Sequence, residues 1–347
     1  MPESDDLFFS PAKQTILFAP LDWGLGHATR CIPLIKQAVS VGHRVLIAAD
    51  RGPLQLLKTE FPSLEFIPFP GYEIRYPKDG NMVLAMAWQL PKLVFKVAKE
   101  FFQIKSIVRE NKIDWVISDN RYGLFGHSAK STFITHQLHI KTGFWEVFFN
   151  LINHWYIRQF DSCWVPDHKG LPNLGGVLSH PKRLPPNCRY IGPLSRFEKM
   201  RTEKEEVDLL VIFSGPEPQR SLFENLVIDQ LKDFKGKVVL VRGLPLAQGN
   251  LILNSSQTAF NHLPDAELNK WLLQAKMVLS RPGYSTVMDM AKLEKKVVFV
   301  PTPGQTEQEY LAERMKEQKI SPFQIQSEFN LKALLVEAQH YTGFVGW

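Results

Sequence analysis

Two stretches of the chain share one order of elements, and this order constrains the fold most: a short apolar run, a glycine-containing turn, then a segment with helical spacing. Residues 15–19 form the first run, the turn at 22–26 follows, and apolar residues recur at helical spacing over 27–41. A second apolar run, 43–49, comes after Gly42. A strand, turn, helix and second strand begin a parallel α/β sheet.

The same order begins again at residue 208. An apolar run leads into the turn Ser214-Gly215-Pro216 and a helix to about residue 231. The length of 347 residues suits two domains, and a polar stretch without periodicity lies near residue 200. We therefore expect two Rossmann-like, doubly wound α/β domains. Their expected bounds are 1–196 and 207–347, with a linker at 197–206, and the last residues could pack back on the first domain. Further strands are expected at 114–118, 133–135, 162–165, 237–241, 277–279 and 297–300, and further helices at 265–274, 284–293 and 307–317.

Charge is distributed unevenly between the two halves. Residues 1–200 hold 24 Lys and Arg against 17 Asp and Glu, a net of +7, whereas residues 201–347 have a net of −1. This indicates that one domain meets an anionic surface or ligand. The three cysteines are scattered, which is typical of reduced thiols in a cytosolic protein. The first ten residues are acidic and do not resemble a secretory signal, and no apolar run approaches the ~20 residues of a spanning helix.

The first glycine-containing turn, Gly24 to Arg30, has three interpretations. Glycines let a backbone approach a ligand, and a helix N-terminus favours an anion. One interpretation is a dinucleotide fingerprint with Asp50 as the ribose-binding acid, although Thr29 occupies the third Gly or Ala position. A second is a purely structural turn. The third, which we favour, has His27 facing an interdomain cleft beside the anion-binding helix end.

The turn over residues 280–286 carries more polar groups suited to a phosphate. Arg281 can pair with a diphosphate, and Gly283 permits close approach. Ser285 and Thr286 can cap the following helix and donate to phosphate oxygens. One by one these residues fit an ordinary helix cap, but their order favours a nucleotide site.

The helix and strand that follow extend this pattern toward a sugar. Asp289, one turn further along the helix, could accept hydrogen bonds from both ribose hydroxyls. Carboxylates and amides then gather at the start of the next predicted helix and suit a polyhydroxylated ring. These residues are Gln305, Glu307, Gln308 and Glu309.

The segment from residue 261 to 313 resembles the donor-binding half of GT-B glycosyltransferases, most closely family 28. This family includes the N-acetylglucosaminyltransferase of peptidoglycan synthesis and the galactolipid synthases. Gly283, Thr286 and Asp289 fall at the Gly, Thr and Glu positions of its motif, with Asp in place of Glu. The resemblance implies a GT-B fold, a UDP-sugar donor in the second domain and an acceptor in the first.

The resemblance also implies roles for further residues. The paired glutamines that contact the donor sugar fall on Gln308 and Glu309, and the change to Glu leaves the sugar open. The uracil contact falls near His262 and Leu263. The glycine-rich turn of the second domain falls on Ser214 and Gly215, and the interdomain arginine near the diphosphate falls on Arg196.

In the first domain, the form Gly-x-Gly-His-x-x-Arg resembles the family's glycine loop. The acceptor hydroxyl must lose a proton, and His27 is the natural general base because histidine titrates near neutral pH. Asp119, at the end of a predicted strand, is the second choice, either directly or by orienting His27. The acceptor side is then expected to include Gly24, Gly26, Arg30 and Arg121.

The leaving diphosphate would be stabilised by the helix end at 283–286 with Arg281 and Arg196, so we expect no metal and no cofactor. No Asp-x-Asp motif ends a predicted strand. His136 and His139 have a spacing that fits a metal, but cleft-lining or loop residues are the preferred interpretation. Inversion at the anomeric carbon is implied by the resemblance alone.

Two stretches of the first domain combine apolar and basic residues. Residues 82–112 include Trp88, Phe95 and Phe102 among several lysines, and 144–160 include Trp155. Such helices can lie on a membrane surface beside a lipid-linked acceptor. Alternatively, they can pack on the core with one face and expose the lysine-rich face to solvent. The sequence thus predicts a cytoplasmic glycosyltransferase that is peripheral to the membrane and has no nucleic-acid partner. It does not identify the acceptor or the oligomeric state. Alternatives are a UDP-sugar 2-epimerase of the same fold, a non-catalytic nucleotide-binding or scaffold subunit and, more distantly, a dehydrogenase.

Overall fold

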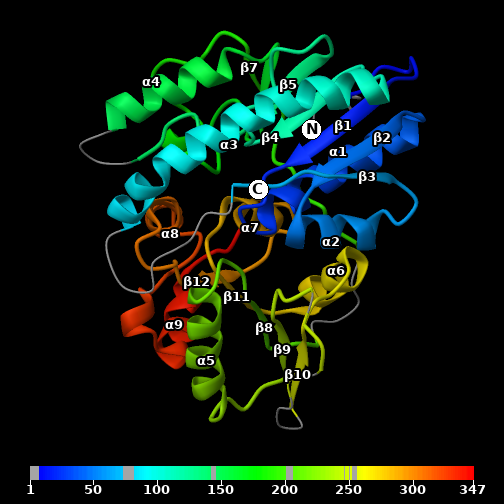
Figure 1. The fold of residues 1–347 in the computed structure, drawn as a ribbon. Helices are drawn as coiled ribbons and strands as arrows, with labels where there is room; N and C mark the ends of the chain where they lie inside the picture. The colour runs from blue at the N-terminus through cyan, green and yellow to red at the C-terminus, as the bar shows by residue number, and fades with distance from the viewer. Residues whose placement is uncertain are drawn as a thin grey trace.

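The computed structural model describes residues 8–72, 82–141, 146–200, 206–245, 247–249, 251 and 256–347, with side chains of the first long helix from residue 89. Two parallel sheets form the framework, one in each half of the chain (Figure 1). The predicted α/β class and the two-sheet organisation are confirmed. Trp88, Phe144, Trp145 and residues 201–205 of the expected linker lie outside the described side chains or residues.

The first sheet has seven strands in the order β3-β2-β1-β4-β5-β6-β7. Its strands are β1 (Thr15–Pro20), β2 (Arg44–Ala49), β3 (Glu65–Pro68), β4 (Trp115–Asp119), β5 (Lys130–Ile134), β6 (Ser162–Val165) and β7 (Cys188–Tyr190). The order reverses between β1 and β4, which pair directly. In open α/β sheets ligands bind outside the carboxyl ends of the strands at such a reversal.

In the described part of the first half, four helices accompany this sheet. They are α1 (Gly26–Val41), α2 (Arg51–Glu60), α3 (Met82–Asn111) and α4 (Glu146–Ile157). Ile32 and Ile35 of α1 and Leu57 of α2 belong to one buried apolar cluster, whereas Ile104 of α3 and Ile157 of α4 belong to another. The two pairs of helices therefore cover different faces of the sheet.

The second sheet has five strands in the order β10-β9-β8-β11-β12. Its strands are β8 (Leu209–Ile212), β9 (Val238–Val241), β10 (Gln257–Phe260), β11 (Val278–Ser280) and β12 (Val297–Phe299). Its helices are α5 (Gln219–Leu231), α6 (Asp265–Gln274), α7 (Tyr284–Lys292), α8 (Thr306–Glu317) and α9 (Leu331–Glu337). The order reverses between β8 and β11, so the turns that follow these two strands meet.

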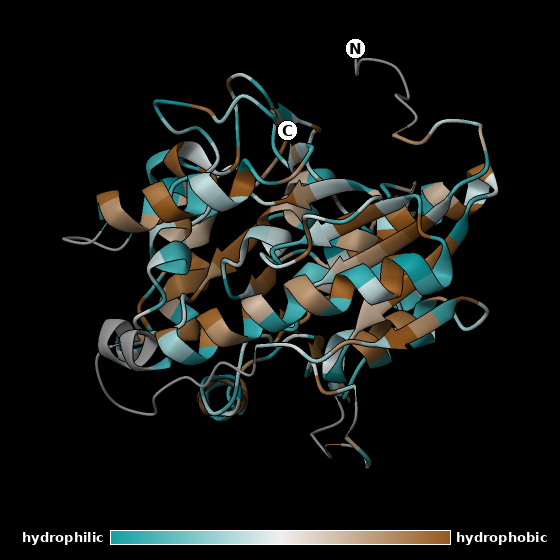
Figure 2. Ribbon diagram, turned by 45° about the horizontal axis from the view of Figure 1, so that its top comes forward, coloured by the Kyte–Doolittle hydropathy of each residue, from teal (hydrophilic) through white to brown (hydrophobic). Residues whose placement is uncertain are grey.

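The two halves touch along a shared apolar cluster. It combines Ile32 and Leu57 of the first half with Tyr284 and Met288 of α7. The strands of both sheets are largely hydrophobic, as parallel strands covered on both faces must be (Figure 2). Near the chain end, the amide of Phe344 donates to the carbonyl of Lys295 in the second half.

Candidate active site

The two glycines of the first turn bring helices α1 and α7 together. Gly24 has a φ of +83°, which favours glycine, and Gly26 begins α1. A Cβ at Gly26 would lie 3.2 Å from the Ser285 hydroxyl oxygen, which donates to the Gly26 carbonyl at 3.0 Å. The first turn of α1 thus lies against the first turn of α7.

His27 and Asp119 meet at the strand-order reversal of the first sheet. Asp119 ends β4 and is fully buried, and its Oδ1 lies 2.7 Å from Nδ1 of His27. Burial works to raise the pKa of Asp119, but Arg30 and His27 lower it to about 2. An ionised carboxylate only accepts hydrogen bonds, so Nδ1 of His27 carries the hydrogen and Nε2 keeps its lone pair.

Arg30, one turn into α1, completes this arrangement. Its side chain is buried, and its Nε donates to Oδ2 of Asp119 at 2.7 Å. Its Nη2 also pairs with Oδ1 of Asp119. Both carboxylate oxygens are therefore engaged, and the acid is fixed in orientation.

His136, which follows β5, links the first half to the second. Its Nδ1 lies 2.9 Å from Nη1 of Arg30, and its Nε2 lies 3.1 Å from Oε1 of Glu307 in the first turn of α8. Gln137 donates to the other oxygen of Glu307. The His136 ring also stacks on Tyr284, with centroids 4.0 Å apart and planes 6° apart.

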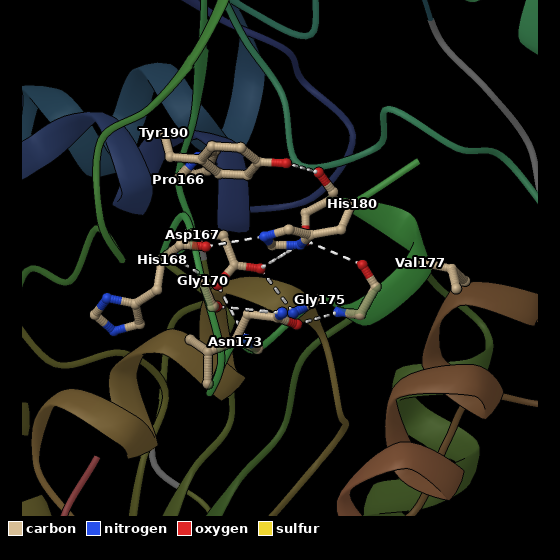
Figure 3. Close-up of polar contacts among 12 residues, drawn as sticks. Pro166, Asp167, His168, Gly170, Asn173, Gly175, Val177, His180 and Tyr190 are labelled. Carbon is tan, nitrogen blue, oxygen red and sulfur yellow. Dashed lines mark hydrogen bonds and ion pairs between the residues drawn. The ribbon is translucent and has the colours of Figure 1, made fainter. Parts of the chain in front are cut away.

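A loop after β6 supports Tyr284 from the other side, and Figure 3 shows the polar contacts within this loop around Asp167. The Tyr284 hydroxyl donates to the Pro166 carbonyl at 3.0 Å. Asp167, fully buried, accepts from the amides of Leu174 and Gly175 at 2.9 Å each and from the Ser179 hydroxyl at 2.6 Å. A carboxylate therefore holds the loop that faces α7.

The same loop reaches α8. Arg314 donates to the Asn173 side-chain oxygen at 2.9 Å, and the Val177 amide donates to the Tyr310 hydroxyl at 3.0 Å. Asp167, which lies two residues past β6, was not predicted from the sequence; the available signal was an acid just after a predicted strand, as with Asp119 at the end of β4.

Comparison with known proteins decides the class of the second half. Residues 217–338 match the glycosyltransferase family 28 C-terminal domain. The second half is therefore similar to the C-terminal domain of that family. The chain as a whole has the GT-B fold, as its similarity to solved glycosyltransferases shows.

Three of these structures illustrate the similarity. The calicheamicin glycosyltransferase CalG4 aligns with a TM-score of 0.63 and 15% identity, covering 94% of this chain and 89% of that one. MurG of Acinetobacter baumannii aligns with a TM-score of 0.55 and 14% identity, covering 95% of this chain and 91% of that one. The spinosyn rhamnosyltransferase SpnG, complexed with thymidine diphosphate, aligns with a TM-score of 0.63 and 11% identity. This alignment covers 95% of this chain and 93% of that one. No curated protein sequence matches the chain.

In the second half, the first turn of α7 lies at the strand-order reversal. Gly283 caps α7, and a Cβ there would lie 3.9 Å from the Thr286 hydroxyl oxygen. The first amides of a helix have no intrahelical acceptor, so they are available to an anion. Gly215, with a φ of +100°, follows β8 beside Thr302, and Ser214 precedes it. The predicted donor residues Ser214, Gly215, Gly283, Ser285 and Thr286 thus come from the two turns at the reversal.

Asp289 and Arg196 already have protein partners. Oδ1 of Asp289 accepts from the Ser195 hydroxyl at 2.6 Å, and burial raises the pKa of Asp289 to about 7. Arg196 Nη1 pairs with Oδ1 of Asp265 at 2.5 Å, and burial raises the pKa of Asp265 to about 6. Leu263, the predicted base contact, is buried in the shared apolar cluster.

Arg281 requires a correction, because its side chain does not point toward a diphosphate. The guanidinium is buried, and Nη1 donates to the carbonyls of Val300 and Pro301 at 2.9 Å each. Nη2 donates to Gln326 at 2.5 Å, and the group lies 4.1 Å from the Phe223 ring centroid. Burial lowers the pKa of Arg281 to about 9. Arg281 therefore ties together the turns after β11 and β12.

The predicted sugar contacts of α8 also differ. Gln308 is buried, and its Oε1 accepts from the Thr302 amide at 2.8 Å. Glu309 is exposed and accepts from the Gly304 amide at 3.0 Å. The acid of α8 that contacts the first half is Glu307, whereas Gln308 and Glu309 bond to the loop before α8.

On the acceptor side, Arg121 is a second correction. It is buried in an ion pair with Glu100, and it donates to the carbonyls of Phe69 and Pro70 at 3.2 and 2.7 Å. It therefore braces the first half internally and does not line an acceptor pocket.

The two histidines whose spacing fits a metal have different partners. His136 joins the Arg30 group, whereas His139 pairs with Glu146 of α4 at 2.8 Å. Within the described ranges no group of three or more His, Cys, Asp or Glu residues is arranged to hold a metal ion.

Proposed function

We propose that this chain transfers a sugar from a nucleotide diphosphate, UDP in the first instance, to an acceptor hydroxyl. The observation that carries the proposal is the pairing of His27 with Asp119 where α1 meets α7. A base with a free Nε2 lone pair then stands next to a helix end suited to a leaving diphosphate.

In this mechanism His27 Nε2 takes the proton of the acceptor hydroxyl as its oxygen attacks the anomeric carbon. Asp119 stabilises the imidazolium that forms. The bond to the diphosphate breaks, and its charge is met by the first amides of α7 with Ser285 and Thr286. Attack opposite the leaving group inverts the anomeric carbon, and no divalent metal is needed for the departure.

The donor would occupy the second domain. Asp289 is the candidate for the ribose hydroxyls and Leu263 for the backbone contact to the base, with Arg196 released from Asp265 on binding. The fold neighbours include proteins complexed with thymidine diphosphate, so dTDP-sugars belong in every donor test beside UDP-sugars.

The acceptor would be lipid-linked and reached at a membrane surface. Helix α3 leaves Val94, Phe95 and Phe102 exposed beside Lys92, Lys96 and Lys99, and α4 leaves Val147, Phe148, Leu151 and Trp155 exposed. Leu93 of α3 and Tyr156 of α4 pack on one apolar cluster, so the two helices are neighbours (Figure 1). Apolar and basic side chains together favour an anionic lipid surface. No helix in the described part of the chain is long and apolar enough to cross a membrane.

A thermal-shift panel tests the donor. UDP, dTDP, GDP, the matching sugars and NADH are each added with and without EDTA. A ligand at 100 times its Kd adds about 2.7 kcal/mol of stability. Stabilisation by uridine or thymidine diphosphates that survives EDTA supports the proposal, and a response only to NADH contradicts it. Conversion of the free donor sugar, without transfer, would instead favour the epimerase.

Cosedimentation with vesicles tests the membrane surface. We expect binding to vesicles containing anionic lipid, weaker binding to neutral vesicles, and loss of binding on Phe95→Ser with Phe148→Ser. Leu222→Ser on α5, also exposed, is the control. Equal binding of both variants would contradict this surface.

A further inference from the structure

The contacts around Arg30 extend beyond the His27–Asp119 pair. We propose that Arg30 is a positioning residue, which fixes the hydrogen positions of this pair and ties it through His136 to Glu307 of the second domain. The inference rests on the proposed function and adds a link between the acceptor and donor domains. We call these five residues the Arg30 network.

The hydrogen positions follow from one property of arginine. A guanidinium only donates hydrogen bonds, so His136 Nδ1 accepts from Nη1 of Arg30 at 2.9 Å. A neutral ring then carries its hydrogen on Nε2 and donates it to Glu307 at 3.1 Å. Burial lowers the pKa of His136, which agrees with a neutral ring. Arg30 thus places the hydrogen of His136 on Nε2 directly, whereas the hydrogen on Nδ1 of His27 is set by Asp119, which Arg30 holds in orientation.

Glu307 is bound to this network from both sides. Its second oxygen accepts from Gln137, so both oxygens face residues of the first domain. Burial works to raise the pKa of Glu307, but His136 and Gln137 together lower it below its usual value. The carboxylate therefore stays charged and provides a fixed acceptor at the domain boundary.

The network also touches the helix expected to bind the diphosphate. His136 stacks on Tyr284, the first residue of α7. Separating the domains would break both this stacking and the contact with Glu307. The base is therefore fully positioned only when the acceptor and donor domains are in contact.

Arg30 also controls the charge near His27, because its Nη2 lies 3.0 Å from Nδ1 of His27. A guanidinium at this distance repels an imidazolium. The other titratable or charged groups around Arg30 and His27 are Asp119 on β4, His136 after β5, Glu307 on α8, Tyr284 on α7 and Cys31 on α1.

The first test needs no substrate, and its variants serve only to assign signals. Long-range ¹H–¹⁵N correlation of the histidine rings reports which nitrogen carries the hydrogen, with signals assigned by His27→Gln and His136→Gln. We expect hydrogen on Nδ1 of His27 and on Nε2 of His136. The opposite tautomer at either ring would overturn the network. If these tautomers are found but no sugar transfer is detected, it is the proposed function that fails.

The second test measures kcat, the donor KM and the histidine ring correlation in Arg30→Gln and Arg30→Lys. We expect kcat to fall by at least about tenfold in Arg30→Gln with an unchanged donor KM, together with loss of the single His136 tautomer. The control is Lys36→Gln, an exposed cation on the same helix. A lower rate with the tautomers of both rings unchanged would mean that Arg30 is only structural.

The third test is a double-mutant cycle between domains. Arg30→Lys and Glu307→Gln should each lower kcat by about tenfold. The loss of kcat in the double variant should be smaller than the product of the two single losses by at least about threefold. Glu313→Gln, an exposed acid on α8, should combine additively with Arg30→Lys. Additive losses for Arg30 and Glu307 would refute the link between the domains.

Discussion

Replacing Asp119 by Asn should destabilise the protein strongly, because it removes the negative charge that balances a buried guanidinium. The pKa of Asp119 is lowered from 3.8 to about 2, and a shift of that size corresponds to about 2.5 kcal/mol. The variant also leaves Arg30 buried without a counter-ion, and breaking a buried pair costs about 3–5 kcal/mol. We therefore expect a loss of about 3–5 kcal/mol at pH 7.

Urea unfolding followed by tryptophan fluorescence measures this loss. The contribution of the Asp119 charge is present above its unfolded pKa near 3.9, and it is lost as pH falls toward 2. In Asp119→Asn, the free energy of unfolding should therefore not show the decrease that protonation of Asp119 causes in the wild type as pH falls. Asp114→Asn is the control, since Asp114 is exposed at the other end of β4 and accepts one hydrogen bond, from the Thr15 amide at 2.7 Å. A loss below about 1 kcal/mol for Asp119→Asn would refute the reasoning.

Three further outcomes are expected. With a pKa of about 7, the ionised fraction of Asp289 rises about tenfold from pH 6 to pH 8. Uridine affinity measured by calorimetry should therefore rise about tenfold over the same range, and Asp289→Asn should show no such rise. Arg281→Lys should cost about 2–4 kcal/mol in urea unfolding without weakening UDP binding to the folded protein; a selective loss of UDP affinity would restore the predicted diphosphate role. Gly123→Ala should cost about 1–3 kcal/mol, because its Cβ would meet the Val97 carbonyl, and an unchanged melting temperature would contradict this.

Much of the framework could be predicted from the sequence because turns and periodicity are local. The helix predicted at 265–274 is α6 as observed, and the helix at 284–293 is one residue shorter. Strands β3, β7 and β10 were not predicted. They have half-buried or exposed patterns and all three lie at sheet edges, so apolar periodicity does not reveal them.

The direction of a side chain was the harder part to predict. Arg281 and Arg121 occupy turns at strand ends, where an arginine could face a ligand, but both turn inward to carbonyls. Only the packed structure reveals those acceptors, because they come from distant segments. His136 and Glu307 lie 171 positions apart, so their contact has no local signal. The strand order explains why His27 and Asp119 meet, because β1 and β4 are neighbours.

The most direct test of the proposed sugar transfer compares the wild type with His27→Gln. Nucleoside diphosphate release from UDP- and dTDP-sugars is measured with a membrane lipid extract as acceptor, and products are detected by mass spectrometry. We expect release by the wild type with a product heavier by one sugar. His27→Gln should bind the donor equally well but release diphosphate at least about 10²-fold more slowly. Equal release by both proteins, with the same product, would contradict His27 as the base and the site described around it.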